Sequence, residues 1–503
     1  MDYSSFFLLI CALFTLIYAL ITTTSRRKSR LPPGPYPFPI IGSLLKLSDK
    51  PHRSLATLSS RYGPLMSLKL GSRTTIVVSS PDVAKEFFHT HDISFSGRSI
   101  PDVARIVDHD QYSLAWLPTG DQWRRLRRIT REYFFSVQRL DGSALLREEK
   151  VQELLDHVDR CCTNGKAINI GAVAFTTTLN VLSKYMFSVD FSQYDTVSSQ
   201  EFKEAVMSLL EIAGKPNLAD FFPILKPLDP QGLVRRGNAY GKKLLAIIDR
   251  IIDQRLQSRL NSSSYDGVSS SVNNDVLDSL LDLTDKEESI FSRDEMRHLF
   301  YVLFIAGTDT TSSTLEWAMT ELLRNREKME TTRSEINKFM KNKKGIVQET
   351  YISQLPYLQA VIKETLRLHP PIPLLVPHQA IQEVQVNSFI VPKNAQILCN
   401  VWAMGRDHNI WSDSETFIPE RFLEVKIDYK GQDYEFIPFG AGRRICPGLN
   451  IAHRMLHIML GSLIHKFEWK LEGNVRVEDM DMEEKFGLTL PRKIPLMAIP
   501  IKL

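Results

Sequence analysis

Residues 438–448 read Pro-Phe-Gly-Ala-Gly-Arg-Arg-Ile-Cys-Pro-Gly, and an apolar helical pattern follows from Leu449 to Phe467. Glycine lets the backbone approach a flat ligand closely and adopt a positive φ without a steric penalty. The two arginines can bind carboxylates of such a ligand through paired N–H groups. Cys446 stands at the N-terminal end of the predicted helix, where free amides and the helix dipole favour a thiolate. Such a thiolate is a suitable axial ligand for heme iron. On the residues alone, a buried, inert cysteine in a glycine turn remains the alternative.

The spacing of this stretch, Phe439-x-x-Gly442-x-Arg444-x-Cys446-x-Gly448, resembles the heme-binding loop of the cytochrome P-450 superfamily. The resemblance implies a heme b cofactor, with Cys446 as the metal ligand and with Phe439 and Arg444 among the residues that bind the heme. It also implies the fold of that family, which is mainly α with a smaller β-rich part, behind an N-terminal transmembrane helix.

Composition narrows the class of protein. Hydrophobic residues make up 43% of the 503 residues, which is ample for a large core. The net charge of +4 is small and the basic residues are spread along the chain, so we expect no nucleic-acid partner. The five cysteines show no CxxC spacing, which argues against a disulfide framework or a zinc site and for a reducing compartment.

The N-terminus predicts a membrane anchor. Residues 3–25 carry no charge, and as a helix they would span about 34 Å, enough for a hydrocarbon core of about 30 Å. Four basic residues follow between Arg26 and Arg30, and basic flanks stay on the cytoplasmic side. We therefore expect residues 1–25 to be a retained anchor; a cleaved signal peptide is the alternative. Residues 26–42 form a basic and proline-rich hinge, and residues 43–503 form a single catalytic domain. The resemblance implies a single-pass protein of the endoplasmic reticulum membrane with its catalytic domain in the cytosol.

An arginine-rich helix is predicted to begin at Asp121. Trp123 and Arg127 are four residues apart and share one face of it. The resemblance implies that this pair contacts a heme propionate. The remaining basic residues of the segment, for which a solvated face is the simpler interpretation, are expected to lie near the thiolate side and to help receive an electron donor; they are Arg124, Arg125, Arg128 and Arg131.

A long helix is predicted over residues 293–324, because Ser292 and Glu295 form a capping box. Its middle reads Ala-Gly-Thr-Asp-Thr-Thr from Ala306 to Thr311. The glycine and the hydroxyl residues weaken the hydrogen-bond ladder, so we expect a notch for ligand or water there, or only a structural kink. The resemblance implies that Thr310 and Asp309 are the catalytic pair that delivers protons during oxygen activation.

Three charged residues are expected to have structural roles. Glu364 and Arg367 are three apart on a predicted helix that covers residues 358–368, and Arg421 lies in a downstream Pro-Glu-Arg-Phe stretch. The resemblance implies that they form a triad that locks the core around the heme loop. His378 stands where many plant relatives have arginine. It is expected to donate to a propionate, and its charge near neutral pH is open.

Apolar residues in the segments that match the family's substrate-contacting regions are predicted to line a pocket for a small apolar substrate. They are Phe304, Ala306, Ile372, Leu374, Phe486 and Leu488, for which a plain core role is the alternative. Residues 213–217, 313–319 and 481–487 are similar to plant microsomal members related to geraniol 8-hydroxylase and ferruginol-type oxidases.

The resemblance implies a hydroxylase that uses dioxygen and NADPH. Its electrons would come from a separate NADPH-cytochrome P-450 reductase, because the chain carries no flavin or nicotinamide fingerprint. The expected substrate is a plant terpenoid such as a monoterpenol, and diterpenoids or phenolic metabolites are the alternatives. A heme-binding sensor without turnover and a heme-thiolate isomerase or dehydratase are alternatives of another class. Asp309 and Thr310 argue against both, since neither needs protons for dioxygen.

Overall fold

The computed structural model describes residues 30–191, 200–263, 275–285, 291–341 and 345–503. The predicted anchor at residues 1–25 lies outside these ranges, as does the first part of the predicted hinge. Among the described residues, no helix combines the length and the apolar composition that a membrane span requires.

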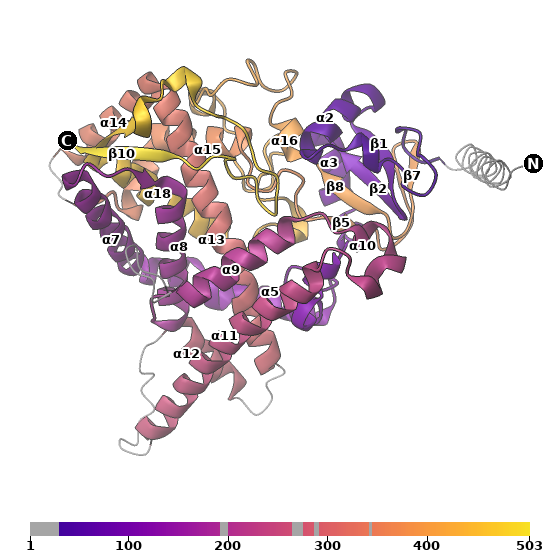
Figure 1. The fold of residues 1–503 in the computed structure, drawn as a ribbon, viewed down its shortest axis with the longest axis horizontal. Helices are drawn as coiled ribbons and strands as arrows, with labels where there is room; N and C mark the ends of the chain where they lie inside the picture. Colours follow the sequence, from indigo (N-terminus) through magenta and orange to yellow (C-terminus); the bar gives the residue numbers. More distant parts are fainter. Residues whose placement is uncertain (1–29, 192–199, 264–274, 286–290, 342–344) are drawn as a thin grey trace, which may run out of the picture.

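The described chain is mainly helical, with a smaller sheet-rich part, as the sequence predicts. Figure 1 shows the five-stranded sheet with α2 at one end of the molecule, and the three-stranded sheet with the C-terminus at the other. The longer helices are α2 (Pro51–Tyr62), α5 (Asp121–Ile129), α7 (Ala144–Thr163), α8 (Ile170–Phe187), α9 (Gln200–Gly214), α11 (Leu233–Ser263), α12 (Val276–Thr284), α13 (Arg293–Arg324), α14 (Arg326–Met340), α15 (Pro356–Leu368) and α18 (Leu449–Lys466).

The largest sheet has the strand order β1-β2-β8-β5-β3, with β2 and β8 parallel and the other pairs antiparallel. Its strands are β1 (Leu65–Leu70), β2 (Arg73–Val78), β3 (Gly97–Arg98), β5 (His378–Gln379) and β8 (Gln396–Cys399). The second sheet has the order β4-β10-β9 and the third consists of β6 and β7. Their strands are β4 (Ile168–Asn169), β10 (Met497–Lys502), β9 (Phe467–Leu471), β6 (Val384–Val386) and β7 (Phe389–Val391).

Helix α13 starts and ends where the sequence predicts. The side chain of Ser292 accepts from the amide of Glu295 and the Glu295 carboxylate accepts from the amide of Ser292, so both groups of the capping box are paired. The expected interruption at Gly307 is absent: α13 is one continuous α-helix through this residue. A Cβ at Gly307 would lie 2.9 Å from Cδ1 of Leu182 on α8. Glycine is therefore explained here by close helix packing rather than by a break in the ladder.

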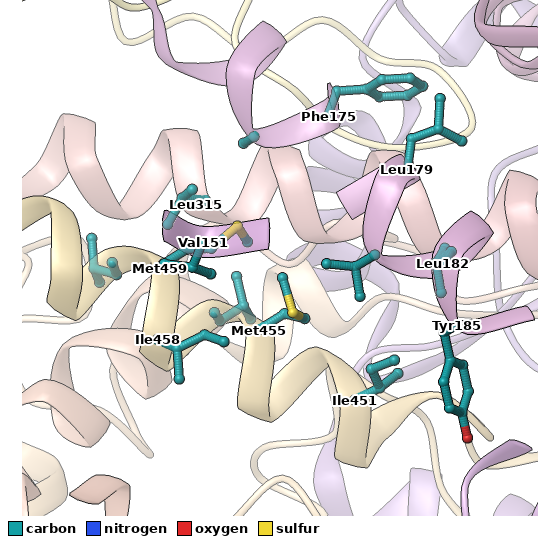
Figure 2. Packing of buried hydrophobic residues seen from close by; sticks show 14 of the residues in the cluster. Val151, Phe175, Leu179, Leu182, Tyr185, Leu315, Ile451, Met455, Ile458 and Met459 are labelled. Carbon is teal, nitrogen blue, oxygen red and sulfur yellow. The ribbon is translucent and has the colours of Figure 1, made fainter. Parts of the chain in front are cut away.

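The core surrounds α13. Figure 2 shows buried side chains of α7, α8, α13 and α18 gathered in one cluster, among them Val151, Leu182, Leu315 and Met455. All four are less than 5% exposed. Burial of one such side chain contributes about 1.5–3 kcal/mol, so this cluster fixes α13 across the centre of the domain.

Two predicted boundaries differ slightly from the observed ones. Helix α15 begins at Pro356, two residues before the predicted start, because proline suits the first helical position. Helix α18 ends at Lys466, since Phe467 pairs with Lys502 in the second sheet.

Candidate heme site

The cysteine loop is held in one conformation by glycine and by the helix that follows it. Gly442 has a φ of 66°, and a Cβ there would lie 2.5 Å from the carbonyl oxygen of Phe88. The amide of Cys446 donates to the carbonyl of Phe439 over 3.0 Å, which closes the loop just before α18. Both features present Cys446 at the N-terminus of α18, as predicted.

The surroundings of the Cys446 sulfur act in opposite directions. Burial raises the pKa of the thiol, whereas hydrogen bonds from the amides of Gly448 and Leu449 and the positive charge of Arg127 lower it. The two amides stand at the N-terminus of α18, where no backbone carbonyl of the helix can accept from them, so they stabilise negative charge on the sulfur. A metal ion that displaces the thiol proton would therefore meet a thiolate with donors already in place.

Three arginines converge beside this loop without a carboxylate partner among the described residues. Burial lowers the pKa of Arg98 and so does the charge of Arg444; burial also lowers the pKa of Arg444, with the charges of Arg127 and Arg443 adding to it. Arg127 is lowered in pKa by burial as well. Their N–H groups donate only to backbone carbonyls, namely those of Ala115 and Val376 for Arg98, Ile445 for Arg127, and Ser96, Leu114 and Leu117 for Arg444. Partly buried cations without counterions fit a ligand that brings two carboxylates.

Two aromatic residues of the predicted site support this cluster. The indole N–H of Trp123 donates to the carbonyl of Leu114 over 3.1 Å, and the Arg444 guanidinium lies 4.9 Å from the ring centre. Trp123 thus holds Arg444 through a cation–π contact. The ring of Phe439 is half-buried and lies 5.3 Å from that of Tyr429.

His378 is buried in β5, opposite Arg98 of β3. Burial and the charge of Arg98 hold the pKa of His378 well below its usual value, so its imidazole is neutral near pH 7. Its Nδ1 lies 2.8 Å from the carbonyl of Phe95 and must carry the proton. A neutral ring of this tautomer has no second N–H to offer a propionate. Arg98, which the sequence analysis missed, would be the donor at this position; its one local signal is the Gly97-Arg98 pair three residues before Pro101.

The predicted proton-delivery pair lies in the middle of α13. Oγ1 of Thr310 donates to the carbonyl of Ala306 over 2.8 Å. Oδ2 of Asp309 accepts a very short hydrogen bond from Oγ1 of Thr489, a residue that the sequence analysis did not name. Burial raises the pKa of the Asp309 carboxyl, and the Thr489 hydroxyl opposes that rise. The carboxyl therefore keeps a proton at higher pH than an ordinary aspartate does.

The six predicted substrate residues fall into different environments. Ala306 is exposed although it lies in the middle of a buried helix, and Ile372 and Leu488 are half-buried. Phe304 has no exposed surface and packs against three other phenylalanines, whereas Leu374 is 9% exposed in a small cluster with α2. Phe486 stacks on His52 at 5.6 Å between ring centres. A segment pattern cannot tell which side of a helix or turn faces a cavity, which explains this spread.

The charged triad joins three segments beneath the loop. Glu364 and Arg367, both fully buried, form a bidentate pair with N–O distances of 2.7 Å, and Nε of Arg421 lies 3.0 Å from Glu364. Arg367 also donates to the carbonyls of Gly405, Ser414 and Thr416. The triad thus fixes residues 405–421 against α15.

The arginines of α5, with Arg131 of the helical turn that follows it, are only partly a solvated face. The side chains of Arg124 and Arg131 are 62% and 76% exposed, and Arg128 is exposed as well. Arg125 does not belong with them: its side chain is 19% exposed and pairs with Glu295 of α13. That partner lies 170 residues away in the chain and was not visible in the local pattern.

These groups together fit a heme. Cys446 would hold the iron, and Arg98, Arg127 and Arg444 would hold the propionates. The other cysteines in the described part of the chain, namely Cys161, Cys162 and Cys399, are also free.

Comparison with known proteins gives the same assignment. A family model described as cytochrome P-450 matches residues 32–497. The protein called cytochrome P-450 76T24 of Catharanthus roseus is 52% identical over 96% of this chain and 97% of its own length. Geraniol 8-hydroxylase of Swertia mussotii is 47% identical over 99% of both chains. Ferruginol synthase of Isodon rubescens is 45% identical over 98% of this chain and 99% of its own.

Proposed function

The chain belongs to the cytochrome P-450 family of heme-thiolate monooxygenases, and we propose that it hydroxylates a small apolar plant terpenoid, first of all a monoterpenol. It is an oxidoreductase, and its electrons come from NADPH through a reductase. The names of two similar proteins, geraniol 8-hydroxylase and ferruginol synthase, support a terpenoid substrate. The observation that carries the proposal is the convergence of Cys446 with three arginines that lack carboxylate partners.

The residues of the site would divide the work. When bound, the heme supplies dioxygen activation and the transfer of one oxygen atom to the substrate. Cys446 would donate its sulfur to the iron, and the guanidiniums would neutralise the propionates. Oγ1 of Thr310 would hold a proton near the reaction site, and Oδ2 of Asp309 would pass protons toward it. The apolar side chains around Ala306 would keep water from the substrate.

A product screen tests the proposed substrate class. The full chain, supplied with NADPH and a plant NADPH-cytochrome P-450 reductase, should oxidise monoterpenols such as geraniol faster than abietane diterpenes or simple phenols. NADPH use without any product from the three classes would contradict the substrate proposal. No NADPH use at all, in a protein that holds heme, would instead favour a sensor or an isomerase.

We also propose that the chain is a single-pass protein of the endoplasmic reticulum membrane, anchored by residues 1–25, with its catalytic domain in the cytosol. Strongly exposed apolar side chains support contact with lipid: Ile40 is 74% exposed, Ile224 is 85% and Leu228 is 72%. Residues 38–45 and 218–228 flank the β1–β2 turn, since the amide of Ser43 donates to the carbonyl of Lys69 and the amide of Ser72 donates to the carbonyl of Phe221.

Loss of residues 1–25 should release much of the protein from microsomes in a sedimentation assay and leave heme binding intact. If heme were lost too, these residues would belong to the folded domain.

The reductase is expected to dock beside α5. Arg127 of this helix contacts the Cys446 loop through Ile445, so the exposed arginines next to it lie near the thiolate side. Exposed positive charge attracts an acidic partner at long range, and salt weakens that attraction.

Reversal of two of these charges should therefore weaken the reductase interaction. Arg128→Glu with Arg131→Glu should raise the apparent KM for reductase by about 3- to 10-fold at low salt and leave the Kd for substrate unchanged. Steady-state NADPH oxidation against reductase concentration measures the effect. Arg476→Glu, at a side chain that is 74% exposed on another segment, is the matched control. Equal KM values for both variants would mean that Arg128 and Arg131 are only part of a solvated face.

A further inference from the structure

The C-terminal turn at residues 486–490 reaches α13 through one buried hydroxyl. Thr489 is 4% exposed, and its Oγ1 donates to Oδ2 of Asp309, which lies 180 residues earlier in the chain. Successive side chains leave an α-helix about 100° apart around its axis, so Asp309 and Thr310 point in different directions. Asp309 thus has its partner on the C-terminal turn, away from the side of α13 that carries Thr310.

The same turn is tied to three other segments, one of which leads directly into a predicted substrate residue. The amide of Leu490 donates to the carbonyl of Pro371 over 2.9 Å, directly before Ile372. A Cβ on Gly214 at the end of α9 would lie 2.5 Å from the amide nitrogen of Leu488, so helix and turn meet backbone to backbone. The indole of Trp317 also donates to the carbonyl of Leu490 over 2.9 Å. Because the turn is held from three sides, a displacement of Leu488 must be felt at its neighbour.

The electrostatic surroundings of Asp309 make its pKa sensitive to the Thr489 hydroxyl. Burial raises the pKa of Asp309, and among its polar neighbours the Thr489 hydroxyl lowers it. The charged groups nearby are Glu316, two turns further along α13, and Arg492 of the C-terminal segment. Burial raises the pKa of Glu316 as well, with the amide of Leu496 and the charge of Arg492 opposing the rise and Asp309 adding to it. Loss of the Thr489 hydroxyl would therefore leave the proton on Asp309 up to a higher pH.

We propose that Thr489 is a positioning residue for proton delivery: its hydroxyl fixes the direction of the Asp309 carboxyl and ties it to the turn that carries Leu488. This inference rests on the proposed role of Asp309 as a proton carrier. A substrate that presses on Leu488 moves the Thr489 backbone with it. Substrate contact and proton delivery are thereby linked at one turn of the chain.

The test uses the heme-loaded full chain with Thr489→Val, which keeps the shape and removes the donor, and with Thr489→Ser, which keeps the donor. The infrared carbonyl band of the Asp309 carboxylic acid is identified by its loss in Asp309→Asn and is then titrated with pH. In Thr489→Val this band should persist to a higher pH than in the wild type, and Thr489→Ser should restore the wild-type titration. Thr332→Val on α14 is the control, because it removes a buried hydroxyl that donates only to the carbonyl of Lys328.

Turnover gives the second readout. Thr489→Val should lower the share of NADPH that ends as product by about tenfold, with more peroxide formed, while the Kd for substrate stays unchanged. An unshifted band in Thr489→Val, or a shifted band with wild-type coupling, would overturn the proposal. An altered Kd without a band shift would show a packing role only. Since the infrared titration needs no substrate, it shows whether the Thr489 hydroxyl acts on Asp309 even if no terpenoid is oxidised.

Discussion

Cys446→Ser is expected to abolish the thiolate-type spectrum and the oxidation of substrate together. The amides of Gly448 and Leu449 and the charge of Arg127 stabilise an anion at this position, but a serine hydroxyl is far less acidic than a thiol and stays protonated. A neutral oxygen cannot push electron density toward the iron as a thiolate does. The reduced protein with carbon monoxide should lose its red-shifted band, and product formation should fall below detection.

Cys399→Ala is the matched control for this experiment. Cys399 is 1% exposed, but it lies in β8 next to Met404, and burial alone raises the pKa of its thiol. Among the described residues no charge or hydrogen bond opposes that rise, so we expect Cys399 to be inert and its replacement to leave the band in place. A red-shifted band that survives Cys446→Ser but not Cys399→Ala would move the ligand to β8 and invalidate the site described above.

Features set by neighbouring residues could be predicted from the sequence. The capping box at Ser292 and Glu295 fixes the start of α13, because both of its hydrogen bonds span three residues. The glycines before Cys446 indicate backbone conformations that other residues adopt only with strain, and Gly442 indeed has a positive φ. The helical class of the chain follows from such local patterns, and so does the position of Cys446 at the start of α18.

Residues whose role depends on partners far away in the chain were missed or misassigned. Arg98 lies in a two-residue strand, and it belongs to the site only because β3 pairs with β5, which is 280 residues further along. Asp309 could be named, but its partner Thr489 could not, since a threonine in a turn carries no signal of its own. Arg125 was assigned to the surface because the local sequence around it gives no sign of its partner Glu295 on α13. The charge of His378 depends on its burial, which no motif encodes.

The second large effect is expected at the triad beneath the loop. Glu364→Gln keeps the volume of the side chain but leaves Arg367, which is fully buried, without its bidentate partner, and Arg421 without its nearest carboxylate. Removal of one member of a buried ion pair destabilises a protein by about 3–5 kcal/mol, chiefly because an uncompensated charge stays buried. We expect a loss of that order in the free energy of unfolding in urea, with release of heme at lower urea concentration.

Glu415→Gln separates this effect from the loss of any ion pair. Glu415 is paired with Arg406 over 3.1 Å, but its side chain is 71% exposed, so its removal should change the stability by about 1 kcal/mol or less. Arg367 keeps its bonds to the carbonyls of Gly405, Ser414 and Thr416 in Glu364→Gln, and carbonyls solvate a guanidinium without cancelling its charge. If the two variants unfolded at the same urea concentration, those carbonyls would be sufficient to compensate the buried charge of Arg367. The segment from Gly405 to Arg421 would then be held beneath the heme loop by backbone contacts rather than by the charge of Glu364.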